Sequence, residues 1–155
     1  PEDNDERIIF YVRGVVETVK KLRWYPSLVH CTGWVSSLAP AYLKRIYADD
    51  PALNSPKIVY SVCDDTFDGA LDSRMQEKLK QEGFSDQDLA ALGQNPVTWI
   101  DLQKIAIDFS DGIVQSSESV DPEVLEYIKK SGKPFLPFPG ADDYVDAYLE
   151  FYKSL

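Results

Sequence analysis

The feature that most constrains this sequence is a change of hydrophobic period around His30. Residues 28–31 form a short apolar run of the kind that a strand buried on both faces shows. Further on, the apolar residues recur at helical spacing, at Leu38, Tyr42, Leu43, Ile46 and Tyr47. This predicts a strand that leads into a helix, with Gly33 and Trp34 at the joint. Because open parallel sheets bind ligands beyond the carboxyl ends of their strands, a site is expected at this joint.

The rest of the chain alternates between the same two patterns. Strands are predicted at 57–63 and 113–115, with a short extended piece at 134–137, and helices at 4–22, 38–47, 99–109, 122–131 and 142–155. The polar stretch 64–94 opens with an acidic turn and contains a capping box at Ser85 and Asp88. Strands separated by helices imply right-handed crossovers and a parallel sheet. The predicted fold class is therefore α/β and Rossmann-like, with helices on both faces and residues 1–155 in a single domain.

Composition excludes several classes of function. A net charge of -10 over 155 residues argues against non-specific binding to nucleic acid and against anionic membrane surfaces, both of which reward lysine and arginine. No apolar run approaches the ~18 residues of a membrane span, and the first residues are too charged for a secretory signal. We therefore expect a cytoplasmic protein. The start at Pro1 suggests a segment cut from something longer.

The residues available for chemistry are few. Cys31 and Cys63 are too few and too far apart for a disulfide scaffold or a zinc site, and each is expected to be a small buried side chain. His30 is the only histidine, so any nucleophile activated by an imidazole would have to use it. There is no Gly-rich phosphate loop and no Walker motif. The sequence accordingly predicts neither a metal nor a bound cofactor.

Several short segments occur in one order that resembles bacterial glycogen synthases and plant starch synthases. That family has a helix, a strand, a His-Cys-His-Asp-Trp-His segment and then Leu-x-Pro-x-Tyr-Leu-Lys. The matching segments here are Asp5-Glu6-Arg7, Val29-His30-Cys31 with Trp34, Leu38-Ala39-Pro40-Ala41-Tyr42-Leu43-Lys44, Tyr47-Ala48-Asp49-Asp50-Pro51, Lys57-Ile58-Val59-Tyr60-Ser61-Val62 and Ser110-Asp111-Gly112-Ile113-Val114 with Ser117. The chain is most similar to the short, synthase-like proteins of the Bacteroides group.

The resemblance implies a fold and an activity. Family members have two Rossmann-like domains facing a cleft, the GT-B architecture, and transfer glucose from ADP-glucose to an α-1,4-glucan without a metal. This chain resembles part of the first, amino-terminal catalytic domain. It has neither the family's Lys-x-Gly-Gly loop nor the second domain, which together hold the donor. Because glycosyl transfer needs positive charge on the leaving diphosphate, we expect this segment alone to be inactive.

The departures from the family pattern concern the site itself. His30 and Trp34 match, and the resemblance makes them candidate substrate-binding residues together with Cys63 and Asp64, but no residue stands out as catalytic. Cys63 occupies the position of a family histidine that faces the transferred glucose, and Asp64 that of an asparagine. A thiol is only a weak hydrogen-bond donor and cannot replace an imidazole there. The other replaced positions are Thr32, Gly33 and Val35, where the family has histidine, aspartate and histidine.

Each candidate also has a simpler structural interpretation. His30 could close a strand with its ring bonded to the backbone, and Trp34 could pack beneath the sheet edge. The acidic turn of Asp64, Asp65 and Asp68 could hold a hard cation, but without a regular loop pattern it is better explained as solvated. The tyrosines at 144, 148 and 152 form a stripe along the last helix that suits either a core face or the surface of a homodimer or synthase complex.

The leading hypothesis is thus a glycogen/starch-synthase-like glycosyltransferase domain, with ADP-glucose and α-1,4-glucan as the family's substrates. The alternative is a non-catalytic regulatory protein that binds glucan or a partner through a degenerate site. A flavodoxin- or response-regulator-like module fits less well, because an acidic cluster after a first strand and a phosphate loop are both missing.

Overall fold

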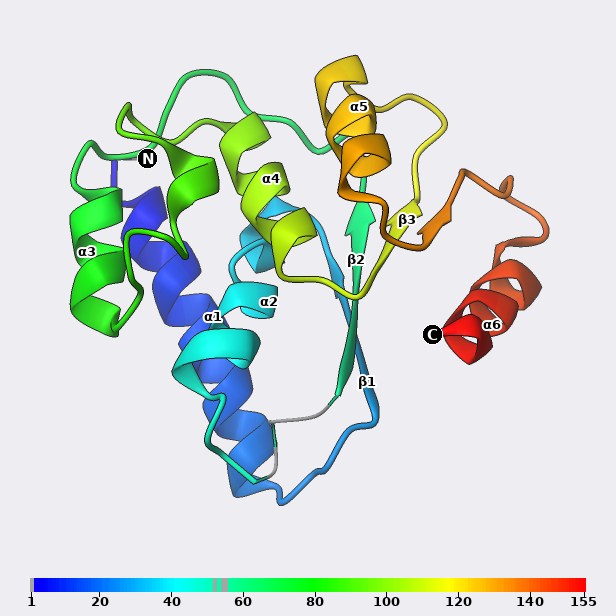
Figure 1. Ribbon diagram of the computed structural model, residues 1–155, viewed down its shortest axis with the longest axis horizontal. Coiled ribbons are helices and arrows are strands. Elements are labelled where there is room, and N and C mark those ends of the chain that lie inside the picture. The colour runs from blue at the N-terminus through cyan, green and yellow to red at the C-terminus, as the bar shows by residue number, and fades with distance from the viewer. Residues whose placement is uncertain (1, 52, 54–55) are drawn as a thin grey trace.

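Four parallel strands in the order β1-β2-β3-β4 form the centre of the computed structural model, which describes residues 2–51, 53 and 56–155 (Figure 1). The strands are β1 (Leu28–Thr32), β2 (Lys57–Val62), β3 (Gly112–Gln115) and β4 (Phe135–Leu136). The α-helices are α1 (Asn4–Lys21), α2 (Ala39–Ala41), α3 (Met75–Glu82), α4 (Trp99–Asp108), α5 (Pro122–Ser131) and α6 (Tyr144–Ser154). The predicted α/β, Rossmann-like class is confirmed.

The two middle strands are buried on both faces, as their continuous apolar sequence predicts. In β2 only Lys57 is exposed, and all of β3 is buried. The register pairs His30 with Val59 and Ser61 with Val114, so the carboxyl ends of β1, β2 and β3 lie along one edge. Since a parallel sheet of this kind needs cover on both faces, the helices must fall on either side of it.

The two faces are covered unequally. On one face α4 and α5 pack over β2 and β3 around a core that includes Tyr60, Ile107 and Ile113. Helix α1 lies on the same side, in a second cluster that reaches α3 and the segment after β1. On the other face, α6 packs Phe151 against Val59 and Val114. Within the described residues, no helix is both long and apolar enough to cross a membrane.

The helix predicted over 38–47 differs in detail. The structure has a 3₁₀ turn, η1 (Trp34–Ser36), then the short α2, and then a π-helical turn, η2 (Tyr42–Ile46). In the wide turn the Tyr47 N–H donates to the carbonyl of Tyr42 at 3.0 Å. Tyr42 and Leu43 are both buried within this segment, so it still contributes to the core that the helical spacing predicted.

The polar stretch after β2 contains α3 and a 3₁₀ turn, η3 (Ala90–Leu92). The predicted reciprocal pair at its centre is confirmed, since the Ser85 N–H donates to Asp88 at 3.0 Å and the Asp88 N–H to Ser85 at 3.1 Å. This Ser85–Asp88 pair begins a turn rather than an α-helix. The segment 48–56 between η2 and β2 lies partly outside the described residues, at 52, 54 and 55.

The helices near the site have well-defined ends. Thr98 and Asp101 form a capping box at the start of α4. Asp121 caps α5, accepting from the Glu123 N–H at 2.8 Å, and Gly132 ends α5 with φ of 68°. The last helix begins at Tyr144, two residues later than predicted.

Candidate functional site at the carboxyl edge of the sheet

The ends of β2 and β3 are joined at the carboxyl edge of the sheet. The backbone N–H of Asp64 donates to the Ser117 hydroxyl at 3.1 Å, and that hydroxyl lies 3.2 Å from the Asp64 carboxylate. The Ser116 N–H donates to the carbonyl of Val62 at 3.0 Å. Asp64 is therefore exposed at the edge as predicted, but its carboxylate already has a partner within the chain.

Asp65 ties this edge to the loop after β1. Its carboxylate accepts the backbone N–H of Trp34 at 2.7 Å and the indole N–H of Trp99 at 3.3 Å. A carboxylate at the first N–H of a 3₁₀ turn is a favourable pairing, because those amides have no partner within the turn. The solvated turn expected for this acidic segment is thus wrong for Asp65, which holds two strand ends and α4 together.

Gly33 lies close to the same carboxylate, that of Asp65. Its φ is 83°, a backbone conformation that favours glycine, and a Cβ at this position would lie 3.1 Å from an Asp65 carboxylate oxygen. The family pattern has an aspartate where this chain has Gly33. Here the acidic group beside that backbone is Asp65, in the loop after β2, and a side chain at position 33 would be crowded against it.

Cys63 follows β2 and is half-buried, with a free thiol. Burial, and next the negative charge of Asp65, raise the pKa of this thiol. Burial also raises the pKa of Cys31 to about 12. Both cysteines are therefore neutral thiols at pH 7, and neither has the character of an activated nucleophile.

Trp34 lies at the edge but faces the core. Its ring packs against Phe67 with centroids 4.8 Å apart, and both side chains are partly buried against the clusters formed by α1, α3 and α4. The backbone N–H of Trp34 points to Asp65. This arrangement favours the packing interpretation of the tryptophan over a platform for stacking sugars.

His30 is turned away from the edge toward α6. Its two ring nitrogens form hydrogen bonds with the hydroxyls of Tyr152 and Ser61, and its ring also packs near Tyr148. Burial lowers the pKa of His30, so the ring is neutral at pH 7. With both nitrogens engaged, the imidazole fastens the last helix to the sheet and has no free group for a ligand.

The structure thus brings only some of the sequence-derived candidates together. Cys63 and Asp64 lie at the edge beside the Gly33 backbone, whereas Trp34 is directed into the core and His30 toward the opposite face. Asp65 and Ser116 join the edge network without having been predicted as site residues. The only signal for Asp65 was its place just beyond a buried strand, which does not tell which of three nearby aspartates turns inward.

The charge of this edge is uniformly negative. The loops that follow the three strands, residues 33–37, 63–68 and 116–121, contain no lysine, arginine or histidine. Their charged members are all acidic: Asp64, Asp65, Asp68, Glu118 and Asp121. Among the residues that the structure describes, no group of three His, Cys, Asp or Glu side chains could hold a metal ion. The edge alone therefore offers nothing that would stabilise a diphosphate.

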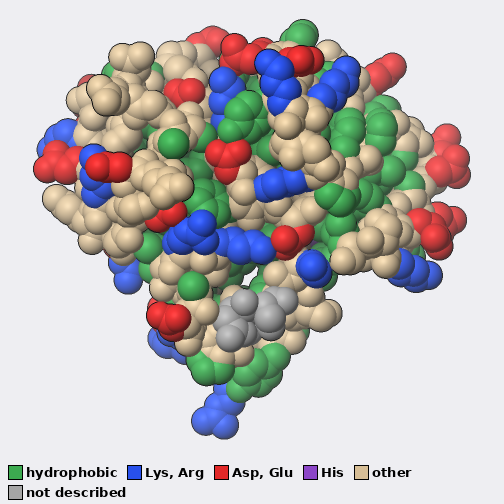
Figure 2. Space-filling model, in the orientation of Figure 1, with side chains coloured by type: hydrophobic (Ala, Val, Ile, Leu, Met, Phe, Trp, Pro, Cys, Tyr) green, Lys and Arg blue, Asp and Glu red, His purple; other side chains and the backbone are tan. Residues whose placement is uncertain are grey.

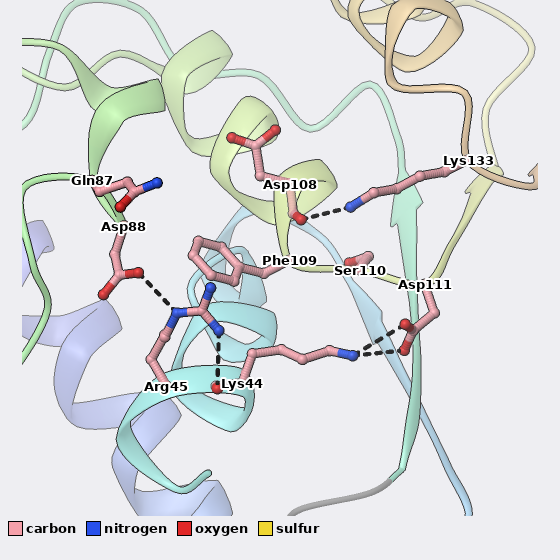
Figure 3. A pocket seen from close by; sticks show the side chains of 9 residues that line it. All are labelled: Lys44, Arg45, Gln87, Asp88, Asp108, Phe109, Ser110, Asp111 and Lys133. Carbon is pink, nitrogen blue, oxygen red and sulfur yellow. Dashed lines mark hydrogen bonds and ion pairs between the residues drawn. The ribbon is translucent and has the colours of Figure 1, made fainter.

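A hollow of about 750 Å³ lies at the opposite, amino-terminal edge of the sheet, where Figure 2 shows side chains of both signs. Figure 3 shows how its basic residues are occupied. Lys44 lies 3.1 Å from both oxygens of Asp111, and Arg45 lies 2.8 Å from Asp88. Lys133 donates to the carbonyls of Ile107 and Asp108. Since each cation already has oxygen partners, the hollow is poorly suited to a phosphate.

This second edge explains several residues that carry the family resemblance. Lys44 ends the Leu-x-Pro-x-Tyr-Leu-Lys segment and Asp111 belongs to Ser110-Asp111-Gly112. Asp111 also accepts the backbone N–H of Ile58 at 2.8 Å, and these contacts lower the pKa of its carboxyl although burial opposes them. The retained residues therefore build the scaffold, whereas the departures are concentrated at the carboxyl edge.

Comparisons with known proteins find relatives of this chain among bacterial glycogen synthases. The chain is 37% identical over 82 residues to the glycogen synthase of Chlorobium luteolum, which covers 53% of this chain and 17% of that protein. It is 29% identical over 122 residues to the glycogen synthase of Clostridium perfringens, and 30% identical over 125 residues to glycogen synthase 2 of Geobacter metallireducens. Each of these two matches covers 79% of this chain and 25% of the relative.

The matched region corresponds to a quarter or less of those relatives' length. No solved structure matches the chain. The family described as starch synthase catalytic domain matches residues 1–133, which include all four of the residues considered above as substrate-binding candidates. The chain therefore belongs to the starch synthase catalytic domain family of glycogen-synthase-like glycosyltransferases.

Proposed function

We propose that this chain is a synthase-type domain whose family reaction is transfer of glucose from ADP-glucose to an α-1,4-glucan, and that these 155 residues do not carry out the transfer by themselves. In this proposal the sheet is part of the first domain of a GT-B enzyme, and its carboxyl edge forms one wall of the donor cleft. The protein would work in the cytoplasm, where a soluble nucleotide sugar is its donor.

The observation that carries the proposal is the composition of the carboxyl edge. A transferase must stabilise the negative charge that develops on the leaving diphosphate, and the protein groups that do so are cations or backbone N–H donors. The edge loops supply five acidic side chains and no basic one. Two backbone N–H groups of this edge are also engaged within the chain: that of Trp34 donates to Asp65 and that of Asp64 donates to Ser117.

The side chains that would recognise the transferred sugar also support the proposed lack of activity. His30 has both nitrogens bonded to hydroxyls of the chain itself, and Cys63 offers a neutral thiol in place of an imidazole. A neutral thiol donates only weakly to a sugar hydroxyl. Both differences lower the affinity expected for a glucosyl group at this edge.

Calorimetric titration of the protein with ADP-glucose, alongside an assay for incorporation of labelled glucose into a maltooligosaccharide, tests the proposal directly. We expect neither heat of donor binding nor incorporation. Glucose incorporation by the folded 155-residue chain would contradict the proposed lack of activity. Glucose incorporation by a longer form of the protein, measured in the same assay, would show that additional segments supply the missing cations.

A non-catalytic role in binding glucan is the second candidate, and the exposed carboxylates favour it. Asp64 and Asp68 are exposed at the edge, and carboxylates are good acceptors for sugar hydroxyls. Titration with maltoheptaose separates the two candidates. Binding that is lost in Asp64→Ala/Asp68→Ala, without turnover in any form of the protein, would favour the binding role, and Glu126→Ala on the outside of α5 serves as the matched control.

A further inference from the structure

One imidazole joins the last helix to the sheet. His30 lies in the middle of β1, and its ring forms hydrogen bonds with the hydroxyls of Tyr152 on α6 and Ser61 on β2. The ring also packs against Tyr152 and Tyr148, with centroids 5.6 and 5.7 Å away. His30 and Tyr152 are 122 residues apart in sequence. The imidazole is therefore part of the long-range contact that docks α6.

The remaining attachment of α6 is apolar. Phe151 is the one buried residue of this helix, which is described throughout, and it packs with Val59 and Val114. Gly112 in β3 lets it approach closely, because a Cβ there would lie 3.0 Å from the Phe151 ring. Figure 1 shows α6 apart from the other helices, at the end of a connection from β4. A change of charge at His30 should therefore affect the docking of α6 before it affects the main core.

The ring has no charged partner in this contact. A neutral imidazole has one donor and one acceptor nitrogen, so one hydroxyl accepts from the ring and the other donates to it. The neighbouring Tyr148 and Tyr152 are uncharged at pH 7, and burial raises the pKa of each phenol further. Burial lowers the pKa of His30, and no charge on a described residue opposes that effect. The docked arrangement therefore favours the neutral ring.

The charged groups of the elements around the ring lie elsewhere. Those of α6 are exposed, namely Asp146, Glu150 and Lys153, and Lys153 lies 3.7 Å from Glu150. On β2, Lys57 is exposed at the far end of the strand, and burial raises the pKa of the Cys63 thiol that follows it. Among the described residues, the hydrogen-bond partners of the imidazole are hydroxyls. A positive charge on the ring would thus be held without a carboxylate beside it.

We propose that the contact of His30 with α6 is an acid-sensitive attachment, in which protonation of the imidazole releases α6 from the sheet while the rest of the fold stays in place. The protonated ring has two donor nitrogens, so the hydroxyl that had donated to it loses its acceptor. The charge is also kept from water without a counter-ion, which costs free energy. Release of α6 exposes the ring to water and removes both costs.

This inference does not rest on the proposed function. The family match ends at residue 133, and α6 begins at Tyr144. The attachment thus joins a strand inside the matched region to a helix beyond it. Its release uncovers Val59 and Val114 on one face of the sheet and frees the hydroxyl of Ser61.

The direction of the pH effect follows from proton linkage. The released ring has the ordinary pKa of about 6.5 and the docked ring a lower pKa, so the released state binds the proton more tightly. The ratio of released to docked helix should therefore rise as the pH falls below about 6.5. Because one proton is involved, the rise is at most about tenfold per pH unit, and it ends once the pKa of the docked ring is passed.

Hydrogen exchange, measured by mass spectrometry on the 155-residue protein between about pH 8 and about pH 5 and corrected for the intrinsic exchange rate, tests the proposal. A released helix of 11 residues is marginal in water, so its amides lose protection. We expect protection in α6 to fall below about pH 6.5, by up to about tenfold per pH unit, while protection in α4 and α5 stays constant. His30→Gln should abolish this response. The matched control Asp146→Asn/Glu150→Gln removes two carboxylates from α6 and should retain it.

Two further variants separate charge from packing. His30→Lys places a charged group at this position and should release α6 already at pH 7, with α4 and α5 still protected. Gly112→Ala crowds Phe151 and should lower protection in α6 at every pH while the pH response remains. The His30→Gln comparison decides the matter if His30→Lys does not fold. Equal loss of protection in α4, α5 and α6 would overturn the proposal, as would a pH response that survives in His30→Gln or constant protection in α6.

Discussion

The carboxylate of Asp65 accepts the backbone N–H of Trp34 at 2.7 Å and thereby fastens the end of β2 to the loop after β1. The same carboxylate reaches the indole N–H of Trp99 at the start of α4. One side chain therefore sets the relative positions of two strand ends and a helix. This fixes the candidate edge, and it also leaves Asp65 with little capacity to bind a ligand.

Replacing Asp65 by alanine should lower the free energy of unfolding by about 1.5–3 kcal/mol, the range for hydrogen bonds to a charged group. Asp65→Asn should cost less, because the amide oxygen can still accept one of the two N–H groups. Urea denaturation monitored by tryptophan fluorescence measures both. Asp64→Asn is the control, since Asp64 is exposed and its change should stay within about 0.5 kcal/mol.

Gly33→Ala should destabilise the protein by about 1–3 kcal/mol. The added methyl group must adopt a φ of 83° and would lie 3.1 Å from the Asp65 carboxylate. Gly14→Ala gives the opposite expectation, because Gly14 lies within α1 and nothing approaches its Cβ position within 4 Å. A gain of up to about 1 kcal/mol is expected there from helix propensity. Equal effects in both variants would show that contact with Asp65 does not matter.

The contact between His30 and α6 should make stability depend on pH. Burial lowers the pKa of His30 in the folded protein below its ordinary 6.5, so the unfolded chain binds the proton first as the pH falls. The free energy of unfolding should therefore decrease on acidification from about pH 6.5 until the folded pKa is passed. The neighbouring Tyr148 and Tyr152 have raised pKa values and do not titrate in this window.

The measurement is chemical denaturation between about pH 8 and about pH 5, compared with His30→Gln, which has no titrating ring. The variant should lose the histidine part of the slope and keep the part due to carboxylates. Tyr152→Phe removes one hydrogen bond to the ring and should cost about 1 kcal/mol at neutral pH. A His30→Gln profile parallel to that of the original protein would show that the ring does not couple to folding.

The two cysteines should differ in reactivity toward a thiol reagent. Burial and the charge of Asp65 raise the pKa of Cys63, so its labelling at pH 7 should be slower than that of a free cysteine. Cys31 is buried, with a pKa of about 12, and should react only when the protein unfolds. Labelling kinetics with Cys63→Ser, with and without urea, assign each phase. Rapid labelling of folded Cys63 would contradict a neutral thiol.

The carboxyl-edge substitutions offer a test of the proposed division between scaffold and site. Cys63→His/Asp64→Asn restores the residues of the family pattern at the end of β2. We expect this variant to fold and still show no glucose transfer, because the edge loops contain no cation for the diphosphate. Lys44→Ala, by contrast, removes the partner of Asp111 at the other edge and should lower the free energy of unfolding by up to about 1 kcal/mol. It should leave binding of ADP-glucose unchanged.

The sequence by itself determined the order of strands and helices, because each depends on a local pattern. The continuous apolar run of β2 and the aspartate and proline that start α5 are readable from a few neighbouring residues. The family resemblance was also readable in this way, since it rests on short collinear segments, and the comparisons confirmed it. The helix after β1 was only partly predicted, because apolar spacing indicates a helix but does not distinguish the short α-helix α2 from the π-helical turn that follows it.

Only the tertiary structure decided the roles of the site residues. Whether His30 faces a ligand or α6 depends on a helix more than one hundred residues away, whose Tyr152 reaches the ring. Whether Asp65 is solvated depends on the amides that two other elements place around it. A residue's type and its neighbours in sequence fix its chemistry, but its partners come from parts of the chain that only the folded sheet brings together.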